Sequence, residues 1–141
     1  MRKFRILLIE DNPDHASLTA DCLQSDGEEV EVECLASGEE ALAFLTDRYA
    51  KANELPDLLL LDINMPGMNG LDLLRHVKSD SKLRIIPAVM LSTSMSMRDI
   101  NEAKANHANS YVLKSSDFDS LESALLQLKR YWRETDTAAP A

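Results

Sequence analysis

The fold is decided by residues 58–70, which read Leu58-Leu59-Leu60-Leu61-Asp62-Ile63-Asn64-Met65-Pro66-Gly67-Met68-Asn69-Gly70. Four consecutive leucines show no alternation of polar and apolar residues, which is typical of a short strand covered on both faces in a parallel sheet. Asp62 ends the run, and its carboxylate is costly to bury. It is therefore expected at the carboxyl end of the strand, where open parallel sheets form their ligand crevice. The Pro-Gly and Asn-Gly pairs predict a tight loop before the next helix.

The length and charge of the chain limit its class. A chain of 141 residues fits a single domain, which we predict over residues 1–135 with a disordered tail at 136–141. The formal net charge of −9 argues against direct nucleic-acid binding and against an anionic membrane surface. The apolar run Ile6–Ile9 is too short for a signal peptide or a membrane span. Cys22 and Cys34 have no metal-ligand spacing, so we expect two buried, reduced thiols in a cytoplasmic protein.

Four further short apolar runs alternate with helical patterns. The runs are Phe4–Ile9, Val30–Cys34, Ala88–Leu91 and Ser110–Lys114. Helices are predicted from Pro13 to about Gly27, after Ser37, from Gly70 to about Ser81, over Arg98–Asn106, and after Ser116 or Asp117. This (βα)5 pattern predicts an α/β fold, a doubly wound five-stranded parallel sheet. The second run alternates strictly and belongs at an edge, which favours the flavodoxin-like strand order 2-1-3-4-5.

That strand order gathers polar residues at one rim of the sheet. Glu10-Asp11 end the first strand and Asp62 ends the third, while Ser92 and Lys114 end the fourth and fifth. Three converging carboxylates repel one another, and a bound hard cation such as Mg²⁺ relieves this repulsion. A carboxylate beside a cation and an ammonium group can attack phosphorus. We therefore expect Asp62 to be the nucleophile, with Lys114 and Ser92 holding the product.

These residues carry a resemblance to the receiver domains of response regulators in two-component signalling, from Phe4 to about Trp132. The resemblance implies that Asp62 is the phosphoacceptor and that Glu10, Asp11, Asp62 and the backbone carbonyl of Asn64 bind Mg²⁺. It further implies that Ser92 is the switch hydroxyl, Tyr111 the switch aromatic residue and Lys114 the phosphoryl-binding cation. From its residue type alone, Tyr111 is equally compatible with a core position.

Two positions depart from the family pattern. Lys114 is followed by Ser115, where the family has a proline after a cis peptide bond, so this peptide is either trans or a costly cis non-proline bond. Ser92 stands where threonine is commoner, but its hydroxyl has the same hydrogen-bonding capacity. The longer 47–56 segment and the Tyr131-Trp132 ending are similar to stand-alone receivers associated with bacterial phytochromes.

The resemblance implies a stand-alone bacterial signalling switch that takes a phosphoryl group from a sensor histidine kinase. We expect it to signal by protein contact, with residues 98–132 as a candidate surface for a homodimer or a downstream partner, and not to be an enzyme beyond its own phosphorylation and dephosphorylation. Two alternatives remain open, a Mg²⁺-dependent aspartyl phosphatase and a nonphosphorylated adaptor. A phosphatase of this kind has a second aspartate two residues after the nucleophile, where this chain has Asn64. Flavin binding is disfavoured because the first loop is acidic.

Overall fold

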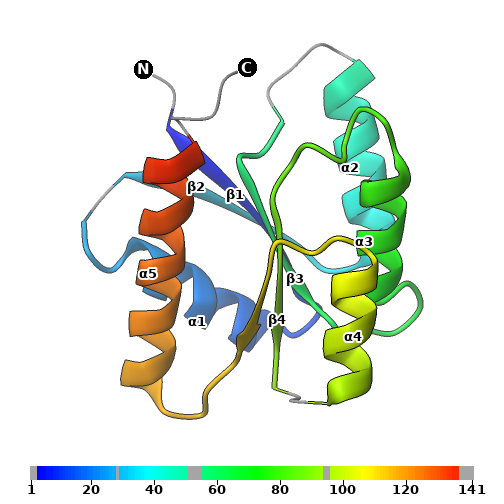
Figure 1. Cartoon of the computed structure of the whole chain (residues 1–141). Coiled ribbons are helices and arrows are strands. Elements are labelled where there is room, and N and C mark those ends of the chain that lie inside the picture. Colours follow the sequence, from blue (N-terminus) through cyan, green and yellow to red (C-terminus); the bar gives the residue numbers. More distant parts are fainter. Residues whose placement is uncertain (1–2, 28, 51–54, 94–95, 137–141) are drawn as a thin grey trace.

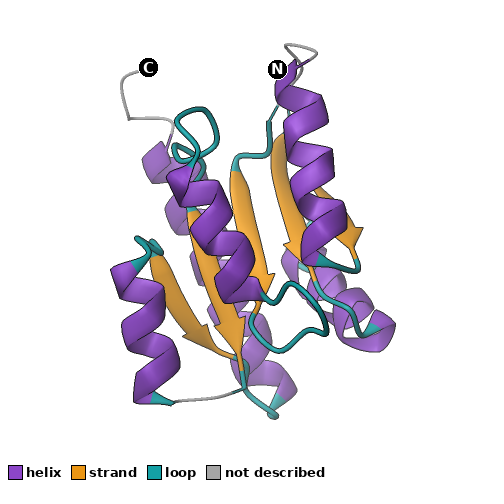
Figure 2. Ribbon diagram, turned by 90° about the vertical axis from the view of Figure 1, so that its right-hand side faces the viewer, coloured by secondary structure: helices purple, strands orange, loops and turns teal. Residues whose placement is uncertain are grey.

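A five-stranded parallel sheet lies between two layers of helices in the computed structural model, which describes residues 3–27, 29–50, 55–93 and 96–136 (Figures 1 and 2). The strands are β1 (Phe4–Ile9), β2 (Val30–Leu35), β3 (Leu58–Asp62), β4 (Ala88–Ser92) and β5 (Ser110–Leu113). The helices are α1 (Pro13–Gln24), α2 (Gly38–Ala50), α3 (Gly70–Ser79), α4 (Met97–Ala105) and α5 (Phe118–Asp136). The strand order β2-β1-β3-β4-β5 confirms the predicted topology.

The burial of each strand follows from its place in the sheet. All five residues of β3 and of β4 are buried, because helices cover both faces of these inner strands. The edge strand β2 instead alternates, with Glu31 and Glu33 exposed. One core, which includes Leu59, Leu61 and Met90, packs against α2, α3 and α4, and the other, with Leu60 and Val89, packs against α1 and α5. The leucine run is therefore shared by both cores.

Local side-chain contacts set the helix boundaries. Asn12 caps α1 by accepting hydrogen bonds from the N–H groups of Asp14 and His15. Ser37 accepts from the Glu40 N–H at the start of α2, the helix predicted to begin after Ser37. Asp117 rather than Ser116 caps α5 by accepting from the Ser120 N–H. Residues 137–141 of the predicted tail lie outside the described residues, and its first residue, Asp136, ends α5.

Three details of the sequence prediction are corrected. The first helix ends at Gln24, not near Gly27, because the chain leaves the helix through Ser25 and reaches a positive φ of 78° at Gly27. The third helix ends at Ser79, two residues before Ser81. Cys34 is exposed rather than buried. It lies near the end of the edge strand, beside the small residues of α1, which do not reach far enough to cover it.

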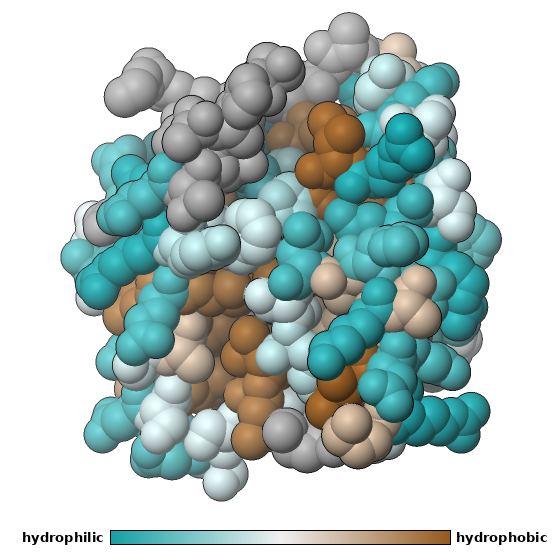
Figure 3. All heavy atoms as spheres, in the orientation of Figure 1, coloured by the Kyte–Doolittle hydropathy of each residue, from teal (hydrophilic) through white to brown (hydrophobic). Residues whose placement is uncertain are grey.

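Three further observations concern the cysteines, membrane spans and exposed apolar side chains. Both cysteines are free thiols, and Cys22 is buried as expected. In the part of the chain that the structure describes, no helix has the length and hydrophobicity that crossing a membrane requires. Apolar side chains are visible over β5 between α4 and α5 (Figure 3), where Leu113 is 43% exposed.

Candidate functional site

The parallel sheet brings three carboxylates together at its carboxyl edge. Ile9 of β1 is paired with Leu61 of β3, so the residues that follow these two, Glu10 and Asp62, lie side by side. Oxygen atoms of Glu10, Asp11 and Asp62 all lie within 4.8 Å of one another. Glu10 and Asp62 are only 4% and 6% exposed, whereas Asp11 is exposed. The cluster is thus open to solvent on the Asp11 side.

Lys114 reaches this cluster from the other side of β4. Its backbone N–H donates to the Ser92 carbonyl at 2.6 Å, which fastens the end of β5 to the end of β4. Its Nζ lies 2.6 Å from Glu10 Oε1 and 3.8 Å from Asp62 Oδ1. No peptide bond among the described residues is cis, so the Lys114–Ser115 peptide is trans. The absence of proline after Lys114 therefore does not prevent its amine from reaching the carboxylates.

The two buried carboxylates have opposite pKa shifts. Burial, with the negative charges of Glu10 and Asp11, raises the pKa of Asp62 to about 7, although Lys114 opposes this shift. The pKa of Glu10 lies below its usual value. Burial alone would raise this pKa, but the hydrogen bond and charge of Lys114, together with the Asn12 N–H, outweigh burial. Glu10 therefore keeps its charge, while Asp62 retains a proton up to near-neutral pH.

The remaining predicted residues lie around this cluster. Ser92, the last residue of β4, is fully buried and follows Leu91, which is paired with Asp62 across the sheet. Asn64 is exposed, two residues after Asp62. Tyr111 is half-buried on β5 and packs against the core on the α2, α3 and α4 side. The structure thus gathers Glu10, Asp11, Asp62 and Lys114, with Asn64, Ser92 and Tyr111 on neighbouring segments.

A close backbone approach beside Asp62 makes Gly70 part of the site. The Gly70 N–H donates to the Ile63 carbonyl at 3.2 Å, which closes the loop after β3. A Cβ atom on residue 70 would overlap the backbone carbonyl of Asp62. Sequence reasoning identified the Asn-Gly pair as a turn signal but did not find this contact. The signal available in the sequence was a glycine at the first position of a helix, where other residues form a helix better.

The oxygen donors fit a hard divalent cation. Three carboxylates within 4.8 Å carry more negative charge than the single ammonium of Lys114 neutralises, and this repulsion adds to burial in raising the pKa of Asp62. A bound cation would replace the proton on Asp62 and relieve the repulsion. A shallow hollow of about 470 Å³ opens beside Glu10 and Asp11, between α1 and the end of β2.

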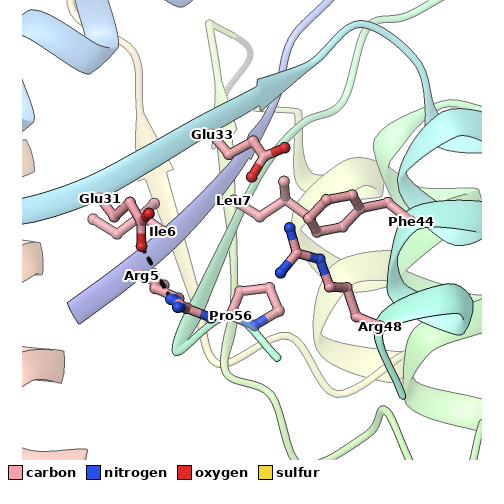
Figure 4. A pocket seen from close by; sticks show the side chains of 8 residues that line it. All are labelled: Arg5, Ile6, Leu7, Glu31, Glu33, Phe44, Arg48 and Pro56. Carbon is pink, nitrogen blue, oxygen red and sulfur yellow. Dashed lines mark hydrogen bonds and ion pairs between the residues drawn. The ribbon is translucent and has the colours of Figure 1, made fainter. Parts of the chain in front are cut away.

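A second cavity, of about 60 Å³, lies away from this cluster, against the first half of β1 (Figure 4). Its wall is formed by the Arg5–Glu31 ion pair, by Phe44 and by Arg48, whose guanidinium lies 4.7 Å from the centre of the Phe44 ring. Its residues come from strand starts and from α2 rather than from the carboxyl edge. It therefore contributes nothing to the chemistry of Asp62.

The fold and the acidic rim are those expected of a receiver domain, and the sequence comparisons identify the family. Residues 6–126 match the response regulator receiver domain, so the chain belongs to this family of two-component signalling proteins. The family resemblance inferred from four separated motifs is thereby confirmed.

Relatives and solved structures extend the match over nearly the whole chain. The probable methanogenesis regulatory protein FilR2 of Methanothrix harundinacea is 37% identical, over 92% of this chain and 83% of that protein. Response regulator Rcp1 of Synechocystis is 32% identical, over 96% of this chain and 93% of that protein. The structure of the Mn²⁺-bound form of Rcp1 has a TM-score of 0.84 and 31% identity, and the match covers 97% of this chain and 99% of that structure. The phosphorylated cyanobacterial phytochrome response regulator RcpA has a TM-score of 0.87, at 35% identity over 95% and 96%.

Proposed function

We propose that this protein is a response regulator that accepts a phosphoryl group on Asp62 with the help of Mg²⁺. The observation that carries the proposal is the position of the Asp62 carboxylate, buried at the end of β3 within 4.8 Å of two further carboxylates and 3.8 Å from the Lys114 amine. This arrangement supplies a nucleophile, oxygen ligands for a cation and a positive charge for phosphoryl oxygens in one place.

Each residue has a separate part in the proposed reaction. The ionised Asp62 oxygen attacks phosphorus in line with the leaving group, forming an O–P bond as the bond from phosphorus to its donor breaks. Glu10, Asp11, Asp62 and the Asn64 carbonyl hold Mg²⁺, which supplies charge neutralisation at the phosphoryl oxygens. Lys114 and the Ser92 hydroxyl bind those oxygens in the product. Lys114 must leave Glu10 to do so, because its amine now lies closer to Glu10 than to Asp62.

The proposed donor is a phosphohistidine of a sensor histidine kinase. In that transfer the N–P bond breaks, and the imidazole takes up a proton as it leaves. Family membership supports this donor, since receiver domains work with histidine kinases. The matched relatives FilR2, Rcp1 and RcpA are covered over 83% to 96% of their lengths, so those three proteins consist largely of a receiver domain. A cytoplasmic location follows from the proposed role.

The proposed output is a change of protein contacts on the side of α4, β5 and α5. Ser92 and Tyr111 lie on the adjacent strands β4 and β5, so movement of Ser92 toward a phosphoryl group is transmitted to this side. Met97, Leu113 and Tyr131 are 64%, 43% and 57% exposed there, which suits a homodimer or a downstream partner. Sedimentation equilibrium before and after phosphorylation tests the homodimer, with a Leu113→Glu variant as the control for this surface.

The two alternative functions, an aspartyl phosphatase and a nonphosphorylated adaptor, would require different residues at the site. An aspartyl phosphatase requires a general acid, and the exposed residue two positions after Asp62 is an amide, Asn64. A nonphosphorylated adaptor requires no cluster of buried charges, which is costly to maintain. Steady turnover of a generic phosphate ester would favour the phosphatase, and a partner bound equally by wild type and Asp62→Asn would favour the adaptor.

Intact-mass measurement after incubation with acetyl phosphate and Mg²⁺ tests the proposal directly. We expect one added phosphoryl group on the wild type and none on Asp62→Asn. Chelation of Mg²⁺ with EDTA should also abolish labelling. Equal labelling of the two proteins would assign the acceptor to another residue.

A further inference from the structure

The loop between β3 and α3, residues 63–69, is held at its end by contacts of its own. The Gly70 N–H donates to the Ile63 carbonyl, and Asn69 forms reciprocal hydrogen bonds with Asp72 at the start of α3. Between these points the loop turns through Gly67, which has a positive φ of 70°. Pro66 and Gly67 are exposed, whereas Met65 on one side of them is buried in the core and Met68 on the other side packs against that core.

A neighbouring helix contacts the loop at Met68, directly after this exposed pair. Glu39 Oε2, in the first turn of α2, accepts a hydrogen bond from the Met68 N–H at 3.3 Å. Gly38 is buried directly beside it, and a Cβ atom there would lie 2.7 Å from the Met68 carbonyl oxygen. The first turn of α2 therefore lies against the loop, and Glu39 provides a polar link across 29 positions of sequence.

We propose that Glu39 is a positioning residue for the metal site, because it holds the loop that carries Asn64. This inference rests on the proposed function, in which the Asn64 carbonyl is a Mg²⁺ ligand. If the Asn64 carbonyl occupies its metal-binding position for only a fraction of the time, the apparent affinity of the site for Mg²⁺ is reduced in proportion to that fraction. Glu39 raises the fraction by restraining the loop four residues after Asn64, without touching the cation itself.

A purely helix-stabilising role is separable, because the adjacent glutamate provides one. Glu40 lies in the same first turn, and its carboxylate and N–H both contact Ser37, the residue before α2. Both glutamates also interact favourably with the positive end of the helix dipole. Only Glu39 adds a contact with residue 68, so Glu40→Ala is a matched control that removes helix stabilisation and leaves the loop contact intact.

The test compares wild type, Glu39→Ala, Glu39→Gln and Glu40→Ala in two measurements. The first is the NMR resonance of the Met68 amide in the metal-free protein, which reports the hydrogen bond without any phosphorylation. The second is the Mg²⁺ dissociation constant from calorimetric titration. We expect Glu39→Ala to shift the Met68 resonance and to weaken Mg²⁺ binding roughly two- to tenfold, the effect of losing one hydrogen bond. Glu39→Gln, which keeps an acceptor oxygen, should restore most of the affinity.

The outcomes separate this inference from the proposed function. It is overturned if Glu39→Ala leaves the Met68 resonance in place, or if its Mg²⁺ dissociation constant is within twofold of that of Glu40→Ala. A wild-type protein that binds Mg²⁺ but is not labelled by acetyl phosphate would refute the proposed function while the role of Glu39 in Mg²⁺ binding stands or falls on the two measurements above. A wild-type protein that binds no Mg²⁺ would overturn both.

Discussion

The Lys114 ammonium is bound to Glu10 rather than to Asp62, with Nζ 2.6 Å from Glu10 Oε1 and 3.8 Å from Asp62 Oδ1. Both partners of the shorter contact are largely buried, with side chains 10% and 2% exposed. Lys114 thus neutralises a carboxylate that is a proposed ligand of the cation, and under the proposed function it would compete with Mg²⁺ for Glu10. In the proposed reaction, the Lys114 ammonium would stay on Glu10 until a phosphoryl group is attached to Asp62.

Lys114→Met should therefore have opposite effects on folding and on metal binding. Removing one partner of a buried ion pair leaves Glu10 uncompensated, so the metal-free protein should lose about 3–5 kcal/mol of unfolding free energy. Mg²⁺ affinity should rise about tenfold, because a competing positive charge is gone. Urea unfolding in EDTA and calorimetric titration measure the two effects. Lys104→Met, at an exposed position of α4, is the control, and weaker Mg²⁺ binding in Lys114→Met would contradict the competition.

Asp62→Asn should stabilise the metal-free protein in a pH-dependent way. The folded protein holds the proton of Asp62 up to a pKa of about 7, against 3.8 for the free side chain. The stability that this proton provides is complete below about pH 4 and is lost as the pH rises through 7. Asparagine resembles the protonated form at every pH. At pH 8 the variant should be more stable than wild type by about 2–4 kcal/mol, as guanidinium unfolding in EDTA would show.

The pH series itself provides the decisive comparison for Asp62. The difference between Asp62→Asn and wild type should shrink as the pH falls from 8 and should be close to zero near pH 4. A constant difference over this range would mean that Asp62 is already ionised in the folded protein at low pH. Saturating Mg²⁺ should reverse the order at pH 8, because the cation stabilises only the carboxylate.

Gly70→Ala should disrupt the region around Asp62. The added Cβ atom would overlap the Asp62 carbonyl, and backbone atoms on both sides must then move. Such overpacking costs about 2–3 kcal/mol, and labelling by acetyl phosphate should fall with it. Gly27→Ala is the matched control, since a Cβ there meets nothing within 4 Å and only its φ of 78° is unfavourable, a cost of about 1 kcal/mol. Equal losses in urea unfolding would argue against the overlap.

His107→Gly should stabilise the protein. His107 follows α4 with a positive φ of 67°, and the Ala108 N–H behind it donates to the Ala103 carbonyl, which closes the helix end. Glycine adopts this conformation without the Cβ clash, so the change should add about 0.5–1 kcal/mol. His76→Gly, inside α3, should instead lose about 1 kcal/mol. Thermal unfolding of both variants measures the pair of effects, and destabilisation by His107→Gly would refute the prediction.

Much of the fold was predictable because it depends on local pattern. The leucine run of β3, the alternation of β2 and the Asn12 and Ser37 helix starts each express the preferences of a few adjacent residues. Strand order followed from these patterns with the rules of chain crossover. The acidic rim followed in turn, because the carboxyl ends of parallel strands meet at one edge.

Contacts between distant parts of the chain were decided only by tertiary structure. The sequence determined that Glu10, Asp62 and Lys114 lie at strand ends, but not that Lys114, 104 positions after Glu10, binds Glu10 more closely than Asp62. It likewise left open the trans peptide after Lys114, and it wrongly predicted a buried Cys34. Local preferences fix which element a residue belongs to. Distances of a few ångströms between elements depend on how side chains of both cores pack, and no single stretch of sequence contains that information.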